Sequence, residues 1–284
     1  MTESSASIAL PTIAVLGAGS MGRAILSGLL RPEVSVDGDV RVTNRTAAKA
    51  AEFEGTAGVR ALATETDPDA NRAAVRGAKI VLIGVKPGMV PDLLAEIADA
   101  LEPDALVVSV AAGVTIATFE GALPESVAVI RSMPNTPAVV GRAVTGISAG
   151  TRSRPEDLAL VRALFETVGE VVTVPESRLD ALGTISGSGP AYVFFLIEQL
   201  TATAIDKGFS AEEAAILVNG TFRGAAELLA ATGTDPADLR RQVTSPNGTT
   251  ERAIAELQGA GLKSIFDRAT DAALARSREL ASGA

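Results

Sequence analysis

The residues Ser245 to Thr250, "SPNGTT", are the first candidate for chemistry in this chain of 284 residues. They place six small, polar or backbone-shaping residues directly before a segment with the apolar spacing of a helix. A plain helix cap needs only one or two such residues. The pattern alone fits two interpretations equally: a binding loop at a helix start, or a cap with more polar residues than it needs.

The second candidate is the glycine-rich segment "GAGSMG", which directly follows a short apolar run and opens a helical pattern. Its spacing fits G-x-G-x-x-G, in which glycines permit a tight turn, close approach of the backbone to a pyrophosphate and close packing of the helix on a sheet. The alternative is a glycine-rich turn that binds nothing, but the flanking strand and helix favour a dinucleotide site. The predicted site residues are Gly17, Ala18, Gly19, Ser20, Met21 and Gly22.

The end of the second predicted strand carries Asn44, Arg45 and Thr46, where sites specific for NAD usually carry Asp or Glu. Arg45 can form a charge-assisted pair with the 2′-phosphate of NADPH. We therefore predict that NADPH is preferred and that NADH is accepted less well. The alternative for Arg45 is a solvated side chain at a strand end.

A third predicted strand ends in the segment "GVKP". Loops at this edge of a parallel sheet normally border the cofactor cleft. We therefore expect Val85, Lys86 and Pro87 to line that cleft, with an ordinary surface lysine as the alternative for Lys86.

The composition excludes several kinds of partner and active site. The absence of Cys and His removes thiolate catalysis, the usual serine triad and the commonest transition-metal ligands, so no metal site is expected. A net charge of −9 lacks the basic surface that nucleic-acid binding requires. The sequence shows neither a basic leader nor a long apolar run, which predicts a cytoplasmic protein that does not enter the membrane.

Apolar runs alternate with helical patterns in the first part of the chain, which predicts an α/β fold with a mostly parallel sheet. Strands are expected at 12–16, 40–44, 78–85, 105–112, 127–133, 143–150 and 170–177, and helices lie between most of them, notably up to residue 30 and at 45–54 and 89–101. The remaining sequence is helical, at 188–207, 210–231, 235–243, 250–258 and 261–281. Its many apolar positions exceed what so short a segment can bury alone, so we also expect it to bury a partner surface.

Together these motifs resemble one family, the pyrroline-5-carboxylate reductases. The order and spacing of the motifs match from near residue 12 to near residue 275, and the last two are the most specific. The motifs are "GAGSMG", "NRT", "VKP", "RSMPNTP" from Arg131, "SGSGPAY" from Ser186 and "VTSPNGTT" from Val243.

The resemblance implies NAD(P)H-dependent reduction of 1-pyrroline-5-carboxylate to L-proline, the last step of proline biosynthesis. It implies two domains: residues 1–177 form a Rossmann-like dinucleotide-binding domain, and residues 178–284 form an all-helical domain for dimerisation and substrate binding. The helical domain would interlock with that of a second chain in a homodimer, which in this family is often assembled into decamers.

The resemblance also assigns roles to single residues. Ser245, Asn247, Gly248, Thr249 and Thr250 belong to the substrate loop, in which backbone N–H groups hold a carboxylate and the Thr250 hydroxyl lies near the ring nitrogen as the catalytic group. The family usually has Gly at position 247, and Asn is the other residue that best tolerates a left-handed backbone, so the loop shape should survive. In "RSMPNTP", Asn135 is a candidate polar contact to the cofactor.

Two other functions compete with this one. A β-hydroxyacid-dehydrogenase-like carbonyl reductase would need a Lys with an Asn one helical turn later, and neither Lys207 nor Lys263 has one. A non-catalytic NADPH-binding sensor would keep the fold without turnover, and the complete "SPNGTT" segment argues against it.

Overall fold

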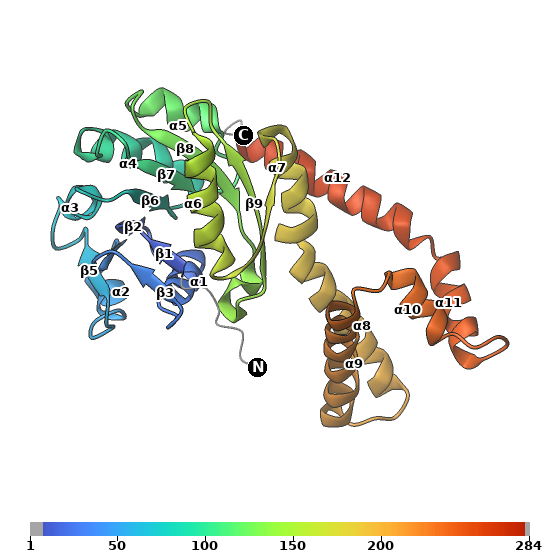
Figure 1. Ribbon diagram of the computed structural model, residues 1–284. Coiled ribbons are helices and arrows are strands. Elements are labelled where there is room, and N and C mark those ends of the chain that lie inside the picture. Colours follow the sequence, from blue (N-terminus) through green and yellow to red (C-terminus); the bar gives the residue numbers. More distant parts are fainter. Residues whose placement is uncertain (1–7, 282–284) are drawn as a thin grey trace. The chain divides into compact units, whose positions relative to one another are not determined.

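The computed structural model describes residues 8–281, and the first part of this range forms an eight-stranded sheet (Figure 1). Its strand order is β10-β9-β8-β7-β6-β2-β4-β5, and β8 and β9 alone pair antiparallel. The strands of this sheet are β2 (Ile13–Leu16), β4 (Val40–Asn44), β5 (Val59–Ala63), β6 (Ile80–Ile83), β7 (Leu106–Ser109), β8 (Ala128–Met133), β9 (Ala143–Ala149) and β10 (Gly169–Thr173). β1 (Ile8–Leu10) and β3 (Val34–Val36) form a separate parallel pair.

The strand β2 lies in the middle of the sheet, and the chain extends from it in both directions. β4 and β5 follow on one side, while β6, β7 and β8 follow on the other. This is the doubly wound order of a Rossmann-like sheet, with the reversal between β2 and β6. The predicted α/β fold class is therefore confirmed.

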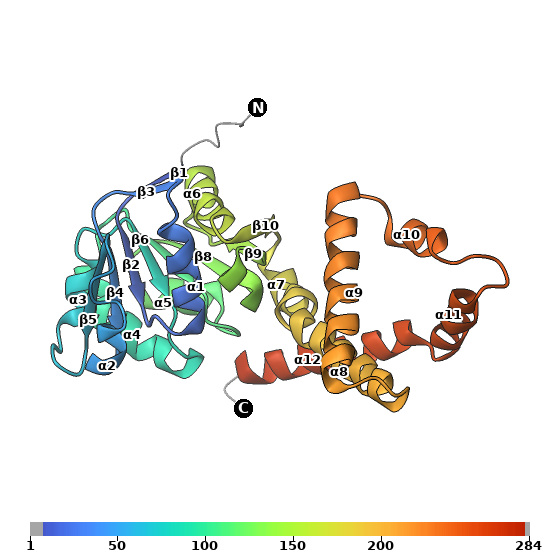
Figure 2. The same cartoon turned by 90° about the horizontal axis from the view of Figure 1, so that it is seen from below.

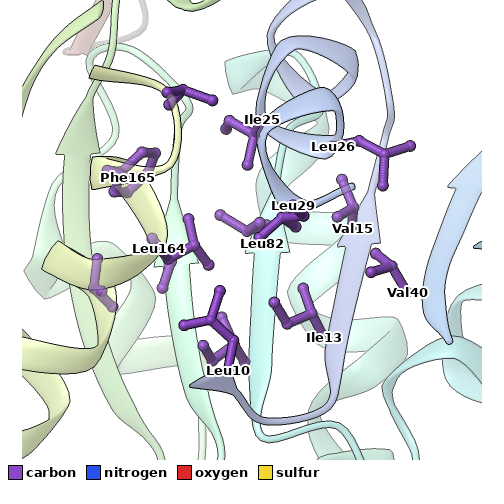
Figure 3. Packing of buried hydrophobic residues seen from close by; sticks show 14 of the residues in the cluster. Leu10, Ile13, Val15, Ile25, Leu26, Leu29, Val40, Leu82, Leu164 and Phe165 are labelled. Atoms are coloured by element: carbon purple, nitrogen blue, oxygen red, sulfur yellow. The ribbon is translucent and has the colours of Figure 1, made fainter. Parts of the chain in front are cut away.

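Two layers of helices cover the sheet because its central strands alternate between two buried faces. Ile13 and Val15 of β2 face one hydrophobic cluster, and Ala14 and Leu16 face the other. The first cluster includes residues of α1 (Ser20–Leu29) and α6 (Pro155–Glu166), as Figure 3 shows for Ile25, Leu26, Leu29, Leu164 and Phe165. The second cluster includes residues of α3 (Ala70–Val75), α4 (Val90–Ile97) and α5 (Ile116–Ala122).

Short helical segments complete this part of the chain. They are α2 (Ala47–Ala51), α7 (Glu176–Leu182), the 3-10 turns η1 (Pro87–Met89), η2 (Ala98–Ala100) and η3 (Thr136–Val140), and the π-helical segment η4 (Gly183–Gly187).

A buried arginine connects β8 to two helices. Arg131 is only 4% exposed, and its guanidinium donates to Glu176 Oε1 at 3.2 Å and to Asp180 Oδ1 at 2.5 Å. The same oxygen of Glu176 accepts the backbone N–H of Ile116 at the start of α5, at 2.7 Å. Because a buried charge is costly without partners, this network fixes how α5 and α7 pack on β8.

The last part of the chain is helical (Figures 1 and 2). Its helices are α8 (Gly189–Asp206), α9 (Ala211–Thr232), α10 (Pro236–Gln242), α11 (Thr249–Gly259) and α12 (Leu262–Ala281). α9 begins with a capping box between Ser210 and Glu213, whose hydrogen bonds hold the pKa of the Glu213 carboxyl below its ordinary value. None of the helices within residues 8–281 combines the length and apolar character needed to cross a membrane.

Contacts divide the chain into two compact units. Within the described range, residues 8–188 and 273–281 form the sheet unit, and Gly189–Ala272 form the helical unit. Our functional division at residues 177 and 178 stays a prediction.

The predicted strands from 12–16 to 143–150 all exist, as do the helices after residue 188. The sequence analysis missed β1, β3, β5 and α7, and it gave no bounds for the helices α3, α5 and α6 that lie between strands. It also extended the strand at 170–177 too far. β10 ends at Thr173 and α7 begins at Glu176, because Pro175 has no N–H for the ladder and precedes the first turn of the helix.

Gly169 at the start of β10 is the position where a side chain is least tolerated. A Cβ atom there would lie 2.1 Å from the Ala143 carbonyl oxygen and 2.4 Å from the Ala143 nitrogen, both backbone atoms of β9. We predict that Gly169→Ala destabilises the protein by about 2–4 kcal/mol, measured by chemical unfolding.

The matched control is Gly121→Ala in α5, where an added Cβ would meet no atom within 4 Å. Replacing this helical glycine should leave stability unchanged or raise it by up to ~1 kcal/mol. Equal stabilities for the two variants would contradict the strand pairing described for β9 and β10.

Candidate functional site

Two glycines allow β2 and β6 to approach closely at their carboxyl ends. Gly17 has a left-handed backbone with φ of 83°, and a Cβ atom there would lie 2.7 Å from Val85 Cγ1 and 3.0 Å from the Val85 nitrogen. A Cβ atom at Gly84 would lie 2.7 Å from the Gly17 carbonyl oxygen. The backbone N–H groups of Gly17 and Ala18 both donate to the Thr43 carbonyl of β4, at 3.1 Å. The predicted glycine turn therefore sits at the reversal point of the sheet.

The turn leads directly into the open N-terminus of α1. Gly19 is the N-cap, no side chain caps the helix, and its first turn carries no acidic residue. The first bond of the helix runs from Arg23 N–H to the Gly19 carbonyl at 2.9 Å, so the helix leaves the N–H groups of Ser20, Met21 and Gly22 without an acceptor. A Cβ atom at Gly19 would meet nothing within 4 Å, which leaves open space in front of these donors.

The end of β4 lies against this turn. Asn44 is 6% exposed, and its Nδ2 donates to the Ala18 carbonyl at 3.3 Å, while its buried Oδ1 has no partner among the described residues. Thr46 caps α2 by accepting the Lys49 N–H at 3.4 Å, and the Arg45 side chain is exposed. Asn44 therefore braces the glycine turn, and Arg45 is the residue of the three that can reach a ligand in solvent.

The segment after β6 borders the same turn. Gly84 N–H donates to the Leu16 carbonyl at 2.8 Å, which holds Val85 against Gly17. Lys86 and Pro87 follow on the exposed side, where Lys86 is the N-cap of η1. The structure thus brings all predicted residues from 17–22, 44–46 and 85–87 to one edge of the sheet.

Asn135 is buried and bonded to the protein itself. Its Nδ2 donates to the Ser186 carbonyl at 2.9 Å, and its Oδ1 accepts the Val144 N–H at 2.9 Å. The amide thus connects the end of β8 to β9 and to η4, and only the second hydrogen on Nδ2 is left for a ligand.

A cavity of about 90 Å³ lies at the carboxyl ends of β7 and β8 within the sheet unit. The sequence analysis did not assign most of its residues, although the rule that places Val85 at the cleft also applies to Gly113, which follows β7. Asp180 lines the cavity and is bonded to Arg131. The lining residues are Ala112, Gly113, Met133, Asp180, Gly183, Thr184, Ser188, Ala273 and Ser277.

In the helical unit, the "SPNGTT" segment forms a tight turn at the start of α11. Asn247 has φ of 58°, the one left-handed residue other than glycine in the described range, so it adopts the left-handed backbone expected of it. Its N–H donates to Glu251 Oε2 at 2.9 Å. Gly248 approaches Ser245 so closely that a Cβ atom would lie 2.9 Å from the Ser245 carbonyl oxygen.

The turn itself uses one of the backbone N–H groups at the start of α11. Gly248 N–H donates to the Ser245 carbonyl at 3.0 Å, and the first bond of the helix runs from Arg252 N–H to the Gly248 carbonyl. The helix therefore leaves the N–H groups of Thr249, Thr250 and Glu251 without an acceptor, whereas the Gly248 N–H is already used within the turn. Ser245 and Thr249 are exposed and Thr250 is half-buried, so their hydroxyls can reach a small anion at the helix start.

Comparisons with known proteins bear on both units. A family model described as pyrroline-5-carboxylate reductase dimerisation matches residues 176–280, and one described as NADP oxidoreductase, coenzyme F420-dependent, matches residues 12–113. The chain is 38% identical over 274 residues to the pyrroline-5-carboxylate reductase of Corynebacterium melassecola, covering 95% of this chain and 99% of the relative. The chain belongs to the pyrroline-5-carboxylate reductase family.

Other relatives agree. The pyrroline-5-carboxylate reductase of Mycobacterium tuberculosis is 39% identical over 291 residues, covering 94% of this chain and 96% of the relative. Among solved structures, the pyrroline-5-carboxylate reductase of Coxiella burnetii has a TM-score of 0.85 and 34% identity, covering 95% of this chain and 98% of that one. The Plasmodium falciparum pyrroline carboxylate reductase with NADP bound, at 23% identity and a TM-score of 0.79 over 95% and 98% of the two chains, shares the fold.

Membership in the pyrroline-5-carboxylate reductase family makes this protein an oxidoreductase. It decides against the β-hydroxyacid-dehydrogenase-like reductase. The matched dimerisation model also supports association of the chain with copies of itself.

Proposed function

We propose that this protein reduces 1-pyrroline-5-carboxylate to L-proline, with NADPH as the preferred donor and NADH as a weaker one. The observation that carries this proposal is the left-handed turn at Asn247, after which α11 begins without a side-chain cap and leaves N–H donors available for an anion. The substrate of the family is a small cyclic imine that carries such an anion, its carboxylate.

The residues at the glycine turn fit a dinucleotide. The close approach of Gly17 to Val85 and the uncapped start of α1 provide space and N–H donors for a pyrophosphate. Arg45 supplies the charge for a 2′-phosphate, and Val85, Lys86, Pro87 and Asn135 are the further residues that we propose contact the cofactor. When bound, the nicotinamide supplies the hydride, so the chain itself has to bind and orient the substrate.

The substrate loop needs no histidine or cysteine to do this. The N–H groups of Thr249 and Thr250 hold the carboxylate, and the Ser245 hydroxyl adds a further hydrogen bond. The Thr250 hydroxyl donates to the ring nitrogen or orients it. A cyclic imine is basic enough to arrive protonated, so this hydroxyl assists and does not have to supply the whole proton transfer.

We further propose that the homo-oligomer contains an obligate dimer formed by the helical unit, and that dimers assemble further, up to a decamer. Support comes from the described helices, in which Ala214 and Val218 alone among hydrophobic residues of the unit are buried. Val193, Phe194, Phe195 and Leu196 are adjacent in α8 and each is at least 42% exposed. Four adjacent residues point around most of a helix, so α8 is apolar on nearly all sides and requires a partner. We also predict that the protein acts on a small-molecule substrate, binds no nucleic acid and is cytoplasmic.

Arg45 tests the cofactor preference. Arg45→Ala removes a charge-assisted contact to the 2′-phosphate, worth about 1.5–3 kcal/mol, so the Kd of NADPH should rise about ten- to a hundredfold. The Kd of NADH should change little, because NADH has no phosphate there. Arg60→Ala removes the same charge from an exposed position of β5 and serves as the control. Equal losses for both cofactors would show that Arg45 does not read the phosphate.

The substrate loop tests the reaction itself. We expect NADPH oxidation that depends on pyrroline-5-carboxylate and yields proline. Ser245→Ala removes one hydroxyl contact to the carboxylate, so the substrate KM should rise about ten- to a hundredfold with little change in cofactor affinity. Thr250→Val deletes the hydroxyl beside the ring nitrogen, so kcat should fall about ten- to a thousandfold. The remaining activity should fade sooner as pH rises, since it depends on substrate that is already protonated.

Steady-state kinetics across pH measure these effects. Thr118→Val, in the first turn of α5, makes the same change outside the loop segment and should leave both constants unaltered. If neither loop variant alters kcat or KM while both lower the melting temperature, the stretch is only a helix cap. If the unaltered protein binds NADPH without turnover, the non-catalytic sensor is the better description.

The dimer has its own test. Light scattering at low micromolar concentration should show no monomer, because the apolar surfaces of α8 and α9 would otherwise face water. A monodisperse and active monomer would overturn the proposed dimer.

A further inference from the structure

The segment that follows β5 runs beside the predicted cofactor residues at the end of β4. β5 pairs with β4 in parallel register up to Asn44 and Ala63. The pairing continues beyond both strands, since Thr64 N–H donates to the Asn44 carbonyl at 3.0 Å and Glu65 N–H donates to the Arg45 carbonyl at 2.9 Å. Glu65 is therefore held next to Arg45, although 20 positions separate them in the sequence.

The side chain of Glu65 is held as well. Its Oε2 accepts the backbone N–H of Ala47 at 2.9 Å, so the carboxylate lies at the start of α2, two residues after Arg45. Its charge stays available, because no ion pair within the described range joins Glu65 to Arg45 or to another cation. An exposed arginine and an unpaired carboxylate thus share the place where the adenosine ribose of the cofactor is expected.

These two charges favour different cofactors. A carboxylate accepts hydrogen bonds from the two ribose hydroxyls of NADH, which is the role of the Asp or Glu that usually ends the second strand. The same carboxylate repels the 2′-phosphate of NADPH. The sequence shows no acid at the end of the second strand, but the structure brings one from the end of the neighbouring strand.

We propose that Glu65 is a specificity-determining residue that limits the preference for NADPH and sustains the use of NADH. The proposal rests on the proposed cofactor site at Gly17–Gly22 and Arg45. It deepens that proposal by naming the group that opposes Arg45.

The test is Glu65→Gln, which keeps the size of the side chain and an oxygen for the Ala47 N–H but removes the charge. The Kd of NADPH should fall about three- to tenfold and the Kd of NADH should stay constant or rise, both followed by nucleotide fluorescence. The gain for NADPH should shrink at high ionic strength, because exposed charges are screened by salt. Glu125→Gln is the control: this exposed residue lies before β8, and β8 is parallel to β7, so it belongs to the opposite edge of the sheet.

Two results would overturn the proposal. The first is equal selectivity between NADPH and NADH in Glu65→Gln and in the unaltered protein. The second is an equal rise of both Kd values with a lower melting temperature, which would make Glu65 only a cap of α2. Failure of the underlying cofactor site is distinguishable from both, because the unaltered protein would then bind neither nucleotide.

Discussion

The close approach of β2 and β6 at Gly17 and Gly84 is the constraint on which the rest of the sheet unit depends. Each glycine leaves no room for a Cβ atom against the backbone of the other strand's end. This approach sets the reversal point of the sheet, because β2 must pair with β4 on one side and β6 on the other. It also directs the chain from Gly17 into the uncapped start of α1. The geometry that builds the core is therefore the same geometry that leaves the N–H donors of the predicted pyrophosphate site uncapped.

Both candidate anion sites of this chain lie at helix starts whose backbone N–H groups are left without a side-chain cap. Both candidate sites place a glycine as N-cap, Gly19 for α1 and Gly248 for α11, and neither helix receives a side-chain cap. A side-chain cap would occupy a donor that a ligand needs. The two helix starts differ in the residue that turns the chain before them: the left-handed residue is Gly17 before α1 and Asn247 before α11.

The sequence predicted what depends on local patterns. The buried strand Ile80–Ile83 reads as a continuous apolar run because both of its faces are covered. The family resemblance, with Gly usual at position 247, implied a left-handed backbone there, and Asn247 adopts it. The strand Val59–Ala63 was not predicted. It is a short, partly exposed edge strand that carries Arg60, so it lacks the continuous apolar run by which buried strands are recognised. Pro175 separates β10 from α7, and reading past it assigned Glu176 to a strand.

Contacts between distant segments were not accessible from the sequence. Asn135 looked like a free polar side chain, whereas its amide holds Ser186 and Val144. Arg131 carried no sign of whether it was structural, because its partners Glu176 and Asp180 lie on a helix that the sequence analysis missed. The position of Glu65 could not be predicted for the same reason, because its place beside Arg45 follows from the pairing of β5 with β4. When a strand or helix is not recognised in the sequence, the contacts of its residues with the rest of the protein cannot be predicted either.

The sheet unit has two large buried clusters, whereas the helical unit has little core of its own. A helix that is apolar on most of its sides is stable when it is covered, and α8 has Phe194 and Phe195 exposed at 66% and 58%. The free energy that hydrophobic burial supplies to an ordinary domain is therefore largely absent within this unit taken alone. Association with a second chain would provide it. Folding of the helical unit and assembly of the oligomer are then one process, and the stability of the unit depends on protein concentration.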